Sequence, residues 1–450
     1  MGEKAGVFKG GVHPFYRKEA TAAAAIAALD PPVRVILPLQ QHIGAPCSPL
    51  VKAGDEVKVG TVIGQAEGFV SAPVHATISG KVKSVGPQPH PMGVPVPAVV
   101  IESDGSDLRE EGRGLDPETL SADDLRNLVR ESGIVGLGGA TFPTHVKLSP
   151  PAEKPIDTLI LNGAECEPYL TADHRLMVER AADIVEGSRI LAKILGVEKI
   201  LFGVEANKPD AADALRGCLS GDGMSVVSLP VKYPQGAEKQ LIKAILGREV
   251  PPPPGLPMDV GVVVQNVGTA LSVKEAIRDG KPLVERVVTV TGSGINRPSN
   301  LLVRLGTPLV TLAEACGGVK EGVERVIMGG PMMGLAQSTL EVPVVKGTSG
   351  LLFLRSEDLG LSGERPCIRC GRCVRACPMI ISPQTIALYA RSKLFEKAEK
   401  WRALDCIECG CCSFSCPSSI PLVHYIRYAK GQIVAARRKQ KQKEEATAGA

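Results

Sequence analysis

The sequence contains few aromatic residues and no long apolar run. Phe, Trp and Tyr make up 3% of its 450 residues, which leaves few rings for the bases of a nucleic acid to stack on. Its 52 basic and 48 acidic residues nearly cancel, so the positive charge typical of nucleic-acid binding is also missing. No stretch offers the eighteen unbroken apolar residues of a membrane span, and no signal-peptide core follows Met1. We therefore expect a cytoplasmic chain that binds no nucleic acid and does not itself cross a membrane.

Cysteine, by contrast, is plentiful and regularly spaced. Eight of the 13 cysteines form two copies of C-x2-C-x2-C-x3-C-P, at 367–378 and 406–417. This spacing is typical of paired [4Fe–4S] clusters, in which the fourth cysteine of each run ligates the other cluster. Zinc, the alternative for C-x2-C pairs, requires neither the third cysteine nor the Cys-Pro pair. The spacing predicts that one cluster is held by Cys367, Cys370, Cys373 and Cys416, and the second by Cys406, Cys409, Cys412 and Cys377.

The other thiols fall outside this pattern. A reducing compartment keeps thiols free, so disulfides are not expected. We expect most of these cysteines to be small buried side chains: Cys47, Cys166, Cys218, Cys316 and Cys411.

The rest of the chain changes pattern several times. Short apolar runs between Gly and Pro turns predict an all-β unit at 33–102, and strands alternating with helical periodicity predict an α/β domain with a parallel sheet further on. The segment between the cysteine runs suits helices, and the charged residues from Ala435 suit a disordered tail. We expect a multidomain α/β plus β protein divided at 1–104, 115–270, 275–350, 360–430 and 431–450.

A glycine cluster opens the α/β region. Gly136, Gly138 and Gly139 allow backbone amides to approach an anion. Thr141 stands where a dinucleotide fingerprint needs its last glycine, and no Gly-Lys-Ser/Thr follows as in a P-loop. Physical reasoning alone leaves both a phosphate site and a tight turn open. Polar residues follow three later strands, where α/β proteins bind ligands, at 162–168, 233–240 and 262–270.

These stretches, in this order, resemble known families. GLGGATFPTHVK, NGAECEP, YPQGAEKQ and VVVQNVGTA are similar to the motifs of the flavin-binding 51-kDa subunit of respiratory complex I. The run from Val51 to Val85 resembles the biotinyl/lipoyl barrel-sandwich hybrid, but residues 63–71 lack the lysine of a carrier domain. Residues 284–312 resemble the soluble-ligand-binding β-grasp (SLBB) domain. With an α-helical ferredoxin domain behind them, the layout, GGVHP and GGPMMG resemble the C subunits of Rnf ion-translocating ferredoxin:NAD oxidoreductases.

The resemblance implies cofactors and partners. It implies FMN, NAD(H) and two [4Fe–4S] clusters, with electrons passing to integral-membrane and ferredoxin-like subunits and only indirectly to ferredoxin. The complex would couple this transfer to Na+ or H+ translocation, with the chain peripheral at the cytoplasmic face of the membrane. One alternative is a soluble flavin–iron–sulfur reductase of the cobalamin reductase type, in which the barrel-sandwich unit follows the clusters. Another is a relay or scaffold protein that has lost the flavin.

The resemblance also implies a set of site residues. Around the flavin phosphate or nucleotide it places Gly136, Gly138, Gly139 and Lys147. Along the isoalloxazine it places Asn162, Glu165, Tyr233, Gly236 and Glu238. Near the phosphate end it places Gln265, Asn266 and Thr269, and in contact with NADH it places Phe142 and Glu167. The sequence departs from the family motifs at Leu137, Ala164, Ala237 and Gly268, which removes charge from the site.

Overall fold

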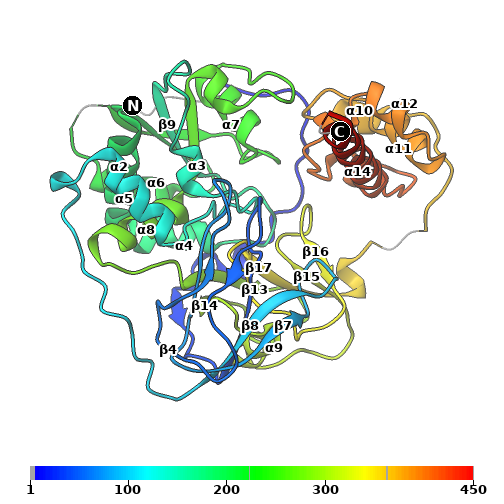
Figure 1. Cartoon of the computed structure of the whole chain (residues 1–450). Coiled ribbons are helices and arrows are strands. Elements are labelled where there is room, and N and C mark those ends of the chain that lie inside the picture. The colour runs from blue at the N-terminus through cyan, green and yellow to red at the C-terminus, as the bar shows by residue number, and fades with distance from the viewer. Residues whose placement is uncertain (1–5, 222, 361–362, 449–450) are drawn as a thin grey trace.

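The α/β domain lies at one side of the molecule (Figure 1). The structure, a computed structural model, describes residues 6–221, 223–360 and 363–448. The domain has a parallel sheet in the order β11-β10-β9-β12, with β9 at Thr158–Gly163, β10 at Lys199–Glu205, β11 at Met224–Leu229 and β12 at Val262–Asn266. The strands are apolar runs because the helices cover the sheet. The helices of the domain are α2 (Ala122–Glu131), α3 (Thr144–Lys147), α4 (Ala172–Glu179), α5 (Ala181–Leu195), α6 (Pro209–Cys218), α7 (Glu238–Leu246) and α8 (Val267–Arg278).

The barrel-sandwich unit is built from two small sheets. The first has the order β2-β8-β7-β4 and the second β3-β5-β6. Their buried faces share one core, to which Val35, Leu37, Ile63 and Ile101 contribute. The strands are β2 (Arg34–Pro38), β3 (Ser48–Pro49), β4 (Glu56–Val57), β5 (Val62–Gln65), β6 (Val74–His75), β7 (Gly80–Gln88) and β8 (Val96–Ser103).

A fourth, six-stranded sheet takes one strand from the N-terminal segment. Its order is β1-β14-β13-β17-β15-β16, and β1 runs parallel to β14 with Ile26 opposite Asn300. The N-terminal residues thus reach the β-grasp sheet before entering the barrel-sandwich unit, after the short helix α1 (Glu19–Ala22). The elements are β1 (Ile26–Ala28), β13 (Glu285–Thr291), β14 (Ser299–Arg304), α9 (Leu309–Ala315), β15 (Val323–Met328), β16 (Leu335–Gln337) and β17 (Gly350–Arg355).

The C-terminal domain is helical, as the sequence predicts. Buried Ile386, Ala390, Ala398 and Ile426 form its core. Its helices are α10 (Arg372–Ala376), α11 (Pro383–Arg391), α12 (Phe395–Lys400), α13 (Cys411–Phe414) and α14 (Leu422–Ala448). Short 3-10 helices lie elsewhere in the chain at Pro117–Thr119, Pro257–Val260 and Ser356–Asp358, and in this domain at Ala403–Asp405.

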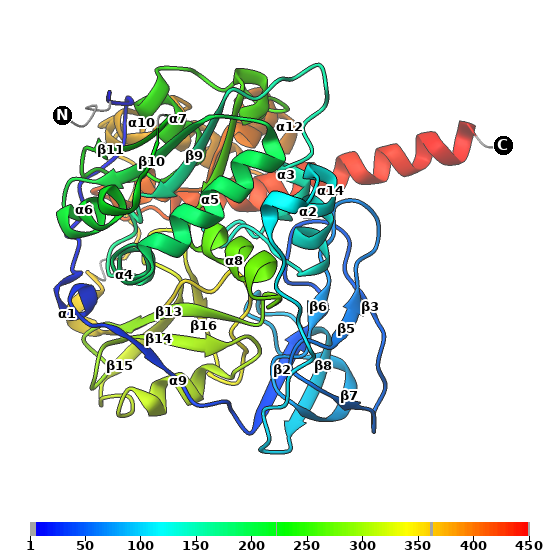
Figure 2. The same ribbon diagram turned by 90° about the vertical axis from the view of Figure 1, so that its left-hand side faces the viewer.

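The end of α14 corrects one expectation. The charged tail was expected to be disordered from Ala435, yet the helix continues to Ala448 and projects away from the body (Figure 2). Ala, Lys, Arg, Gln and Glu are strong helix formers, so this composition extends a helix once packing has nucleated it. Among the helices in the described ranges, none combines the length and the apolar character needed to cross a bilayer.

One buried lysine joins three of the units. Lys346, which follows the β-grasp strands β15 and β16, donates from Nζ to Pro73 O (2.8 Å) and Gly133 O (2.7 Å). Pro73 belongs to the barrel-sandwich unit, and Gly133 precedes the glycine cluster. Burial lowers the pKa of Lys346 to about 8. The two carbonyl groups replace water around the ammonium group, so this side chain fixes where the barrel-sandwich unit meets the α/β domain.

Two helical glycines test how α8 is positioned. A Cβ added at Gly187 in α5 would overlap Ala270 O in α8, whereas one at Gly217 in α6 would meet nothing within 4 Å. We expect Gly187→Ala to lower the free energy of unfolding by about 1–3 kcal/mol through overpacking. The control Gly217→Ala should raise it by about 0.5–1 kcal/mol, because alanine favours the helix. Melting followed by helical circular dichroism measures both, and equal melting temperatures would contradict close α5–α8 packing.

Candidate functional site

The carboxyl edge of the parallel sheet brings two of the predicted loops together. Asn162, next to the last residue of β9, lies opposite Asn266, which ends β12. The Asn162 side chain donates from Nδ2 to Gly236 O (2.8 Å) and accepts from Ala164 N (3.2 Å). The loop after β9 is therefore tied to the loop before α7. The sequence predicted both loops at this edge, and the structure places them there.

The glycine cluster lies beside the N-terminus of α8. Leu137 N donates to Thr269 Oγ1 (2.9 Å), and Gly136 N donates to Phe142 O (2.9 Å), which closes the loop. Gly138 and Gly139 are exposed. Gly139 has φ of +114° with open space around it. Within the described residues, no acceptor from the chain meets the amides of Gly138 and Gly139. Free amides beside a helix N-terminus suit an anion such as a phosphate.

Further donors surround this edge. Lys147 Nζ contacts Glu238 Oε1 at 2.7 Å and Val264 O at 3.2 Å. Gln265 is 2% exposed, and its Nε2 has no hydrogen-bond partner in the part of the chain that the structure describes. Asn266 caps α8 by accepting from Gly268 N (2.8 Å). A buried amide without an acceptor is costly unless a ligand supplies one. The residues present therefore fit FMN, which offers both phosphate oxygens and ring carbonyl groups.

Glu165 is engaged within its own loop. Its backbone has φ of +43°, and its carboxylate accepts from Asp173 N (2.8 Å) and His174 N (3.1 Å) at the start of α4. Lys18 Nζ donates to Glu165 O (2.8 Å), and Lys208 Nζ donates to Ala164 O (2.7 Å). Two buried lysines thus hold the backbone of this loop. Sequence reasoning missed both, because neither lysine belongs to a motif or lies near the loop in the chain.

Glu167 and Tyr233 lie at the boundary with the cysteine domain. Glu167 accepts from Met332 N (3.1 Å) and Met333 N (2.9 Å) in the GGPMMG turn, and burial raises its pKa to about 7. Tyr233 is 1% exposed, and its hydroxyl donates to Cys409 O at 2.8 Å. The resemblance implied nucleotide and isoalloxazine contacts for these two residues. In the structure, their side chains connect the flavin-type loops to the turn and to a cysteine loop.

The cysteine runs fall into two environments. Cys377, Cys406, Cys409 and Cys412, one predicted ligand set, line a single small cavity together with Cys411. In the other set, Cys373 and Cys416 share an apolar cluster, while Cys367 and Cys370 are exposed. No three His, Cys, Asp or Glu side chains in the described ranges converge as they would around one metal ion. The first environment faces the α/β domain, and the second includes the exposed edge of the chain.

Cys411 lies beside the ligand set of Cys377, Cys406, Cys409 and Cys412, called the inner set below because it faces the α/β domain. It is fully buried and lies near Tyr233 O, at 4.0 Å from Sγ. A hydrogen bond from its thiol lowers the pKa of Cys409. Cys47, Cys166 and Cys316 are also buried, as expected, whereas Cys218 is half-buried.

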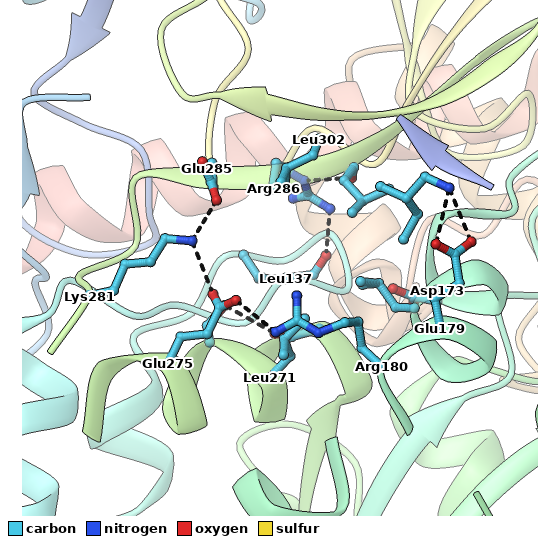
Figure 3. A pocket seen from close by; sticks show the side chains of 15 residues that line it. Leu137, Asp173, Glu179, Arg180, Leu271, Glu275, Lys281, Glu285, Arg286 and Leu302 are labelled. Carbon is cyan, nitrogen blue, oxygen red and sulfur yellow. Dashed lines mark hydrogen bonds and ion pairs between the residues drawn. The ribbon is translucent and has the colours of Figure 1, made fainter. Parts of the chain in front are cut away.

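A cavity of about 270 Å³ lies beneath the glycine loop, between the α/β domain and the β-grasp sheet (Figure 3). Its charged side chains have polar partners, some in the cavity lining and some outside it. Lys281 lies between Glu285 (2.5 Å) and Glu275 (3.7 Å), and Arg180 reaches Glu275 at 3.3 Å. Arg286 donates to Leu137 O (3.4 Å) and so supports the loop from below. The charged groups that line this cavity between two domains therefore already have partners within the protein.

Four family models match consecutive parts of the chain. The RnfC barrel sandwich hybrid domain matches residues 6–106, the Nuo51 FMN-binding domain 129–275, the SLBB domain 287–336 and the 4Fe-4S dicluster domain 366–421. They confirm the predicted fold class, FMN and the [4Fe–4S] type of cluster. A chain of the air-oxidised NAD+-reducing [NiFe]-hydrogenase is 20% identical, with a TM-score of 0.47, over 62% of this chain and 54% of that one.

Curated relatives match over nearly the full length. The C subunit of the proton-translocating ferredoxin:NAD(+) oxidoreductase complex of Clostridium ljungdahlii is 50% identical, over 97% of this chain and 96% of that protein. The C subunit of the Na(+)-translocating complex of Acetobacterium woodii is 50% identical, over 98% of this chain and 100% of the relative. The C subunit of the ion-translocating oxidoreductase complex of Rhodobacter capsulatus is 45% identical, over 94% and 83%.

The unpaired amide of Gln265 gives a test of the flavin site. If Nε2 donates to FMN, Gln265→Leu should weaken FMN binding about tenfold, the loss of one hydrogen bond. The thermal stability of the FMN-free protein should be unchanged or higher, since an unsatisfied buried amide is removed. Titration of flavin fluorescence measures the dissociation constant. Gln240→Leu is the control, because Gln240 Nε2 contacts Pro378 O (3.4 Å) on the cysteine side. An unchanged FMN affinity in Gln265→Leu would contradict this role.

Proposed function

The chain belongs to the family of C subunits of ion-translocating ferredoxin:NAD(+) oxidoreductase complexes, and we propose how it carries electrons between NAD(H) and its partner subunits. The proposal uses one FMN and two [4Fe–4S] clusters. The observation that carries it is the 2.8 Å hydrogen bond from Tyr233 OH to Cys409 O, because it joins the flavin-type loops directly to a cluster loop.

When bound, FMN converts the two electrons of a hydride from NADH into single electrons, which are what clusters accept. The chain's residues bind and orient it. The open amides of Gly138 and Gly139 and the ammonium of Lys147 suit the phosphate, and Gln265 supplies a donor from the sheet edge. We assign the remaining cofactor contacts as the family motif implies, to Gly136, Phe142, Asn162, Glu165, Glu167, Tyr233, Gly236, Glu238, Asn266 and Thr269. For Glu165, Glu167 and Tyr233, the contacts described above favour support of the surrounding loops.

The two predicted ligand sets take different positions in this path. Cys377, Cys406, Cys409 and Cys412 hold the inner cluster, because Tyr233 and Gln240 contact their loops from the α/β domain. Cys367, Cys370, Cys373 and Cys416 hold the outer cluster, two of whose ligands are exposed. Electrons from NADH thus leave through the outer cluster, and the same path serves the reverse direction.

Four arginines lie in sequence beside the predicted ligands of the outer cluster, and we call them the arginine collar. It consists of Arg365, Arg369, Arg372 and Arg375, all exposed. None of the four forms an ion pair with another described residue, and nearby Glu364 already pairs with Arg391 at 2.8 Å. Ile368, inside the collar, is 68% exposed. An apolar centre with a basic rim suits an acidic partner protein. We place the chain at the cytoplasmic face of the membrane, held there by such partners.

Anaerobic purification from riboflavin-replete cells tests the function. We expect about one FMN and about eight iron atoms per chain, as two [4Fe–4S] clusters require. NADH should bleach the flavin and then the cluster absorbance. In the control Cys370→Ser, which lacks an outer ligand, flavin bleaching should persist while about half of the iron is lost. A protein with clusters but no FMN would instead be a relay, and the proposed site would be wrong.

The arginine collar gives a test of the partner surface. Arg369→Gln with Arg372→Gln should slow electron transfer to the other subunits in isolated membranes by about tenfold at low salt, because steering by charge is lost. The difference should shrink as ionic strength rises. Arg113→Gln with Arg325→Gln removes the same charge from exposed residues elsewhere and should change nothing. Equal rates in the two double variants would contradict docking at the collar.

A further inference from the structure

The N-terminal strap, residues 6–18, runs between the α/β domain and the cysteine domain. Figure 1 shows it as a dark-blue trace passing between α7 and the helices of the cysteine domain. Beyond the strap, the chain reaches the β-grasp sheet as β1. The strap includes the GGVHP motif at residues 10–14, which is not part of the proposed flavin or cluster sites.

On the cluster side, the strap lies directly on the inner ligand loop. Gly11 N donates to Ala376 O at 2.9 Å. Gly10 has φ of +73°, and a Cβ added there would lie 2.5 Å from Cys377 O and 2.6 Å from Cys377 C. A side chain at this position is therefore excluded twice, by the left-handed backbone and by contact with a cluster ligand.

On the flavin side, the strap pairs with the backbone of Tyr233. Val12 N donates to Tyr233 O (2.8 Å), and Tyr233 N donates to Val12 O (2.9 Å), as in a two-residue antiparallel bridge. Lys232 Nζ also donates to Phe8 O at 2.9 Å. Tyr233 is the residue whose hydroxyl contacts Cys409 O. The strap and the Tyr233 side chain therefore both contact the junction between the flavin-type loops and the inner cluster loop.

The far end of the strap holds the loop after β9. Tyr169 N donates to Tyr16 O at 2.7 Å. Buried Lys18 donates from Nζ to Glu165 O (2.8 Å) and to Leu170 O, and pairs with the Glu165 carboxylate at 4.0 Å. One short segment therefore contacts the inner cluster loop, Tyr233 and the loop that carries Glu165.

We propose that the N-terminal strap is the positioning element for internal electron transfer, holding the inner cluster loop at a fixed separation from the flavin loops. The inference rests on the proposed function. The step moves one electron from FMN, reduced beforehand by NADH, to the oxidised inner cluster, and no covalent bond forms or breaks. Its rate depends on separation and orientation, so a small displacement of the loop is enough to slow it.

The test is Gly10→Ala in the complete chain. The added methyl group displaces the strap from Cys377. The matched control is Gly68→Ala, whose φ of +78° is equally unfavourable but whose Cβ would meet nothing within 4 Å. After anaerobic mixing with NADH, flavin bleaching should keep its wild-type rate in both variants. Cluster reduction should slow by roughly 10- to 100-fold in Gly10→Ala only. FMN content, iron content and full reduction by dithionite should match the wild type.

Each outcome decides between the two proposals. Cluster reduction at the wild-type rate in Gly10→Ala would overturn the strap proposal alone, and loss of iron in that variant would also overturn it, by making the strap part of cluster assembly. A wild-type protein whose flavin is absent or unbleached by NADH would overturn the proposed function, and the strap proposal with it. If Gly10→Ala does not fold, Lys232→Ala removes the anchor on Phe8 O. It should slow cluster reduction in the same direction, and an unchanged rate would overturn the strap proposal.

Discussion

The hydrogen bond between Tyr233 and the carbonyl of Cys409 is the contact on which the arrangement of the chain depends. It joins a loop at the carboxyl edge of a parallel sheet to a loop in a domain that begins more than a hundred residues later. A buried phenol needs an acceptor, and here the acceptor belongs to the neighbouring domain. The flavin-type loops and the cysteine loops are therefore placed by one shared interior, which also contains Val12, Cys166 and Cys411.

Buried lysines organise the loops around this interior. Lys18, Lys208 and Lys346 are nearly inaccessible, and each donates to backbone carbonyl groups of irregular segments. Desolvation opposes the charged form, which is why burial lowers the pKa of Lys18 to about 8. Carbonyl groups of loops have no partners from regular secondary structure. A long side chain with three donors satisfies several of them at once, so the loops are held without strands or helices of their own.

Local pattern was sufficient for much of the fold. The cysteine spacing, the parallel sheet and the helices of the cysteine domain follow from neighbouring residues. The roles of Lys18 and the packing of Glu167 on the GGPMMG turn do not, because they depend on contacts between residues far apart in the chain. The prediction of a disordered tail after Ala435 is wrong for another reason. The charge of these residues suggested disorder, whereas their helix propensity favours the continuation of α14. The ligand assignments remain predictions.

The path of the strap imposes an order on biosynthesis. Residues 6–18 leave the ribosome well before the residues that they contact, because Ala376 and Cys377 are made more than three hundred residues later. At about 5–20 residues per second, the strap waits on the order of 20–70 seconds for its binding site. This segment is thus made well before the loop that it contacts, and it reaches its native position only after the cysteine domain has formed.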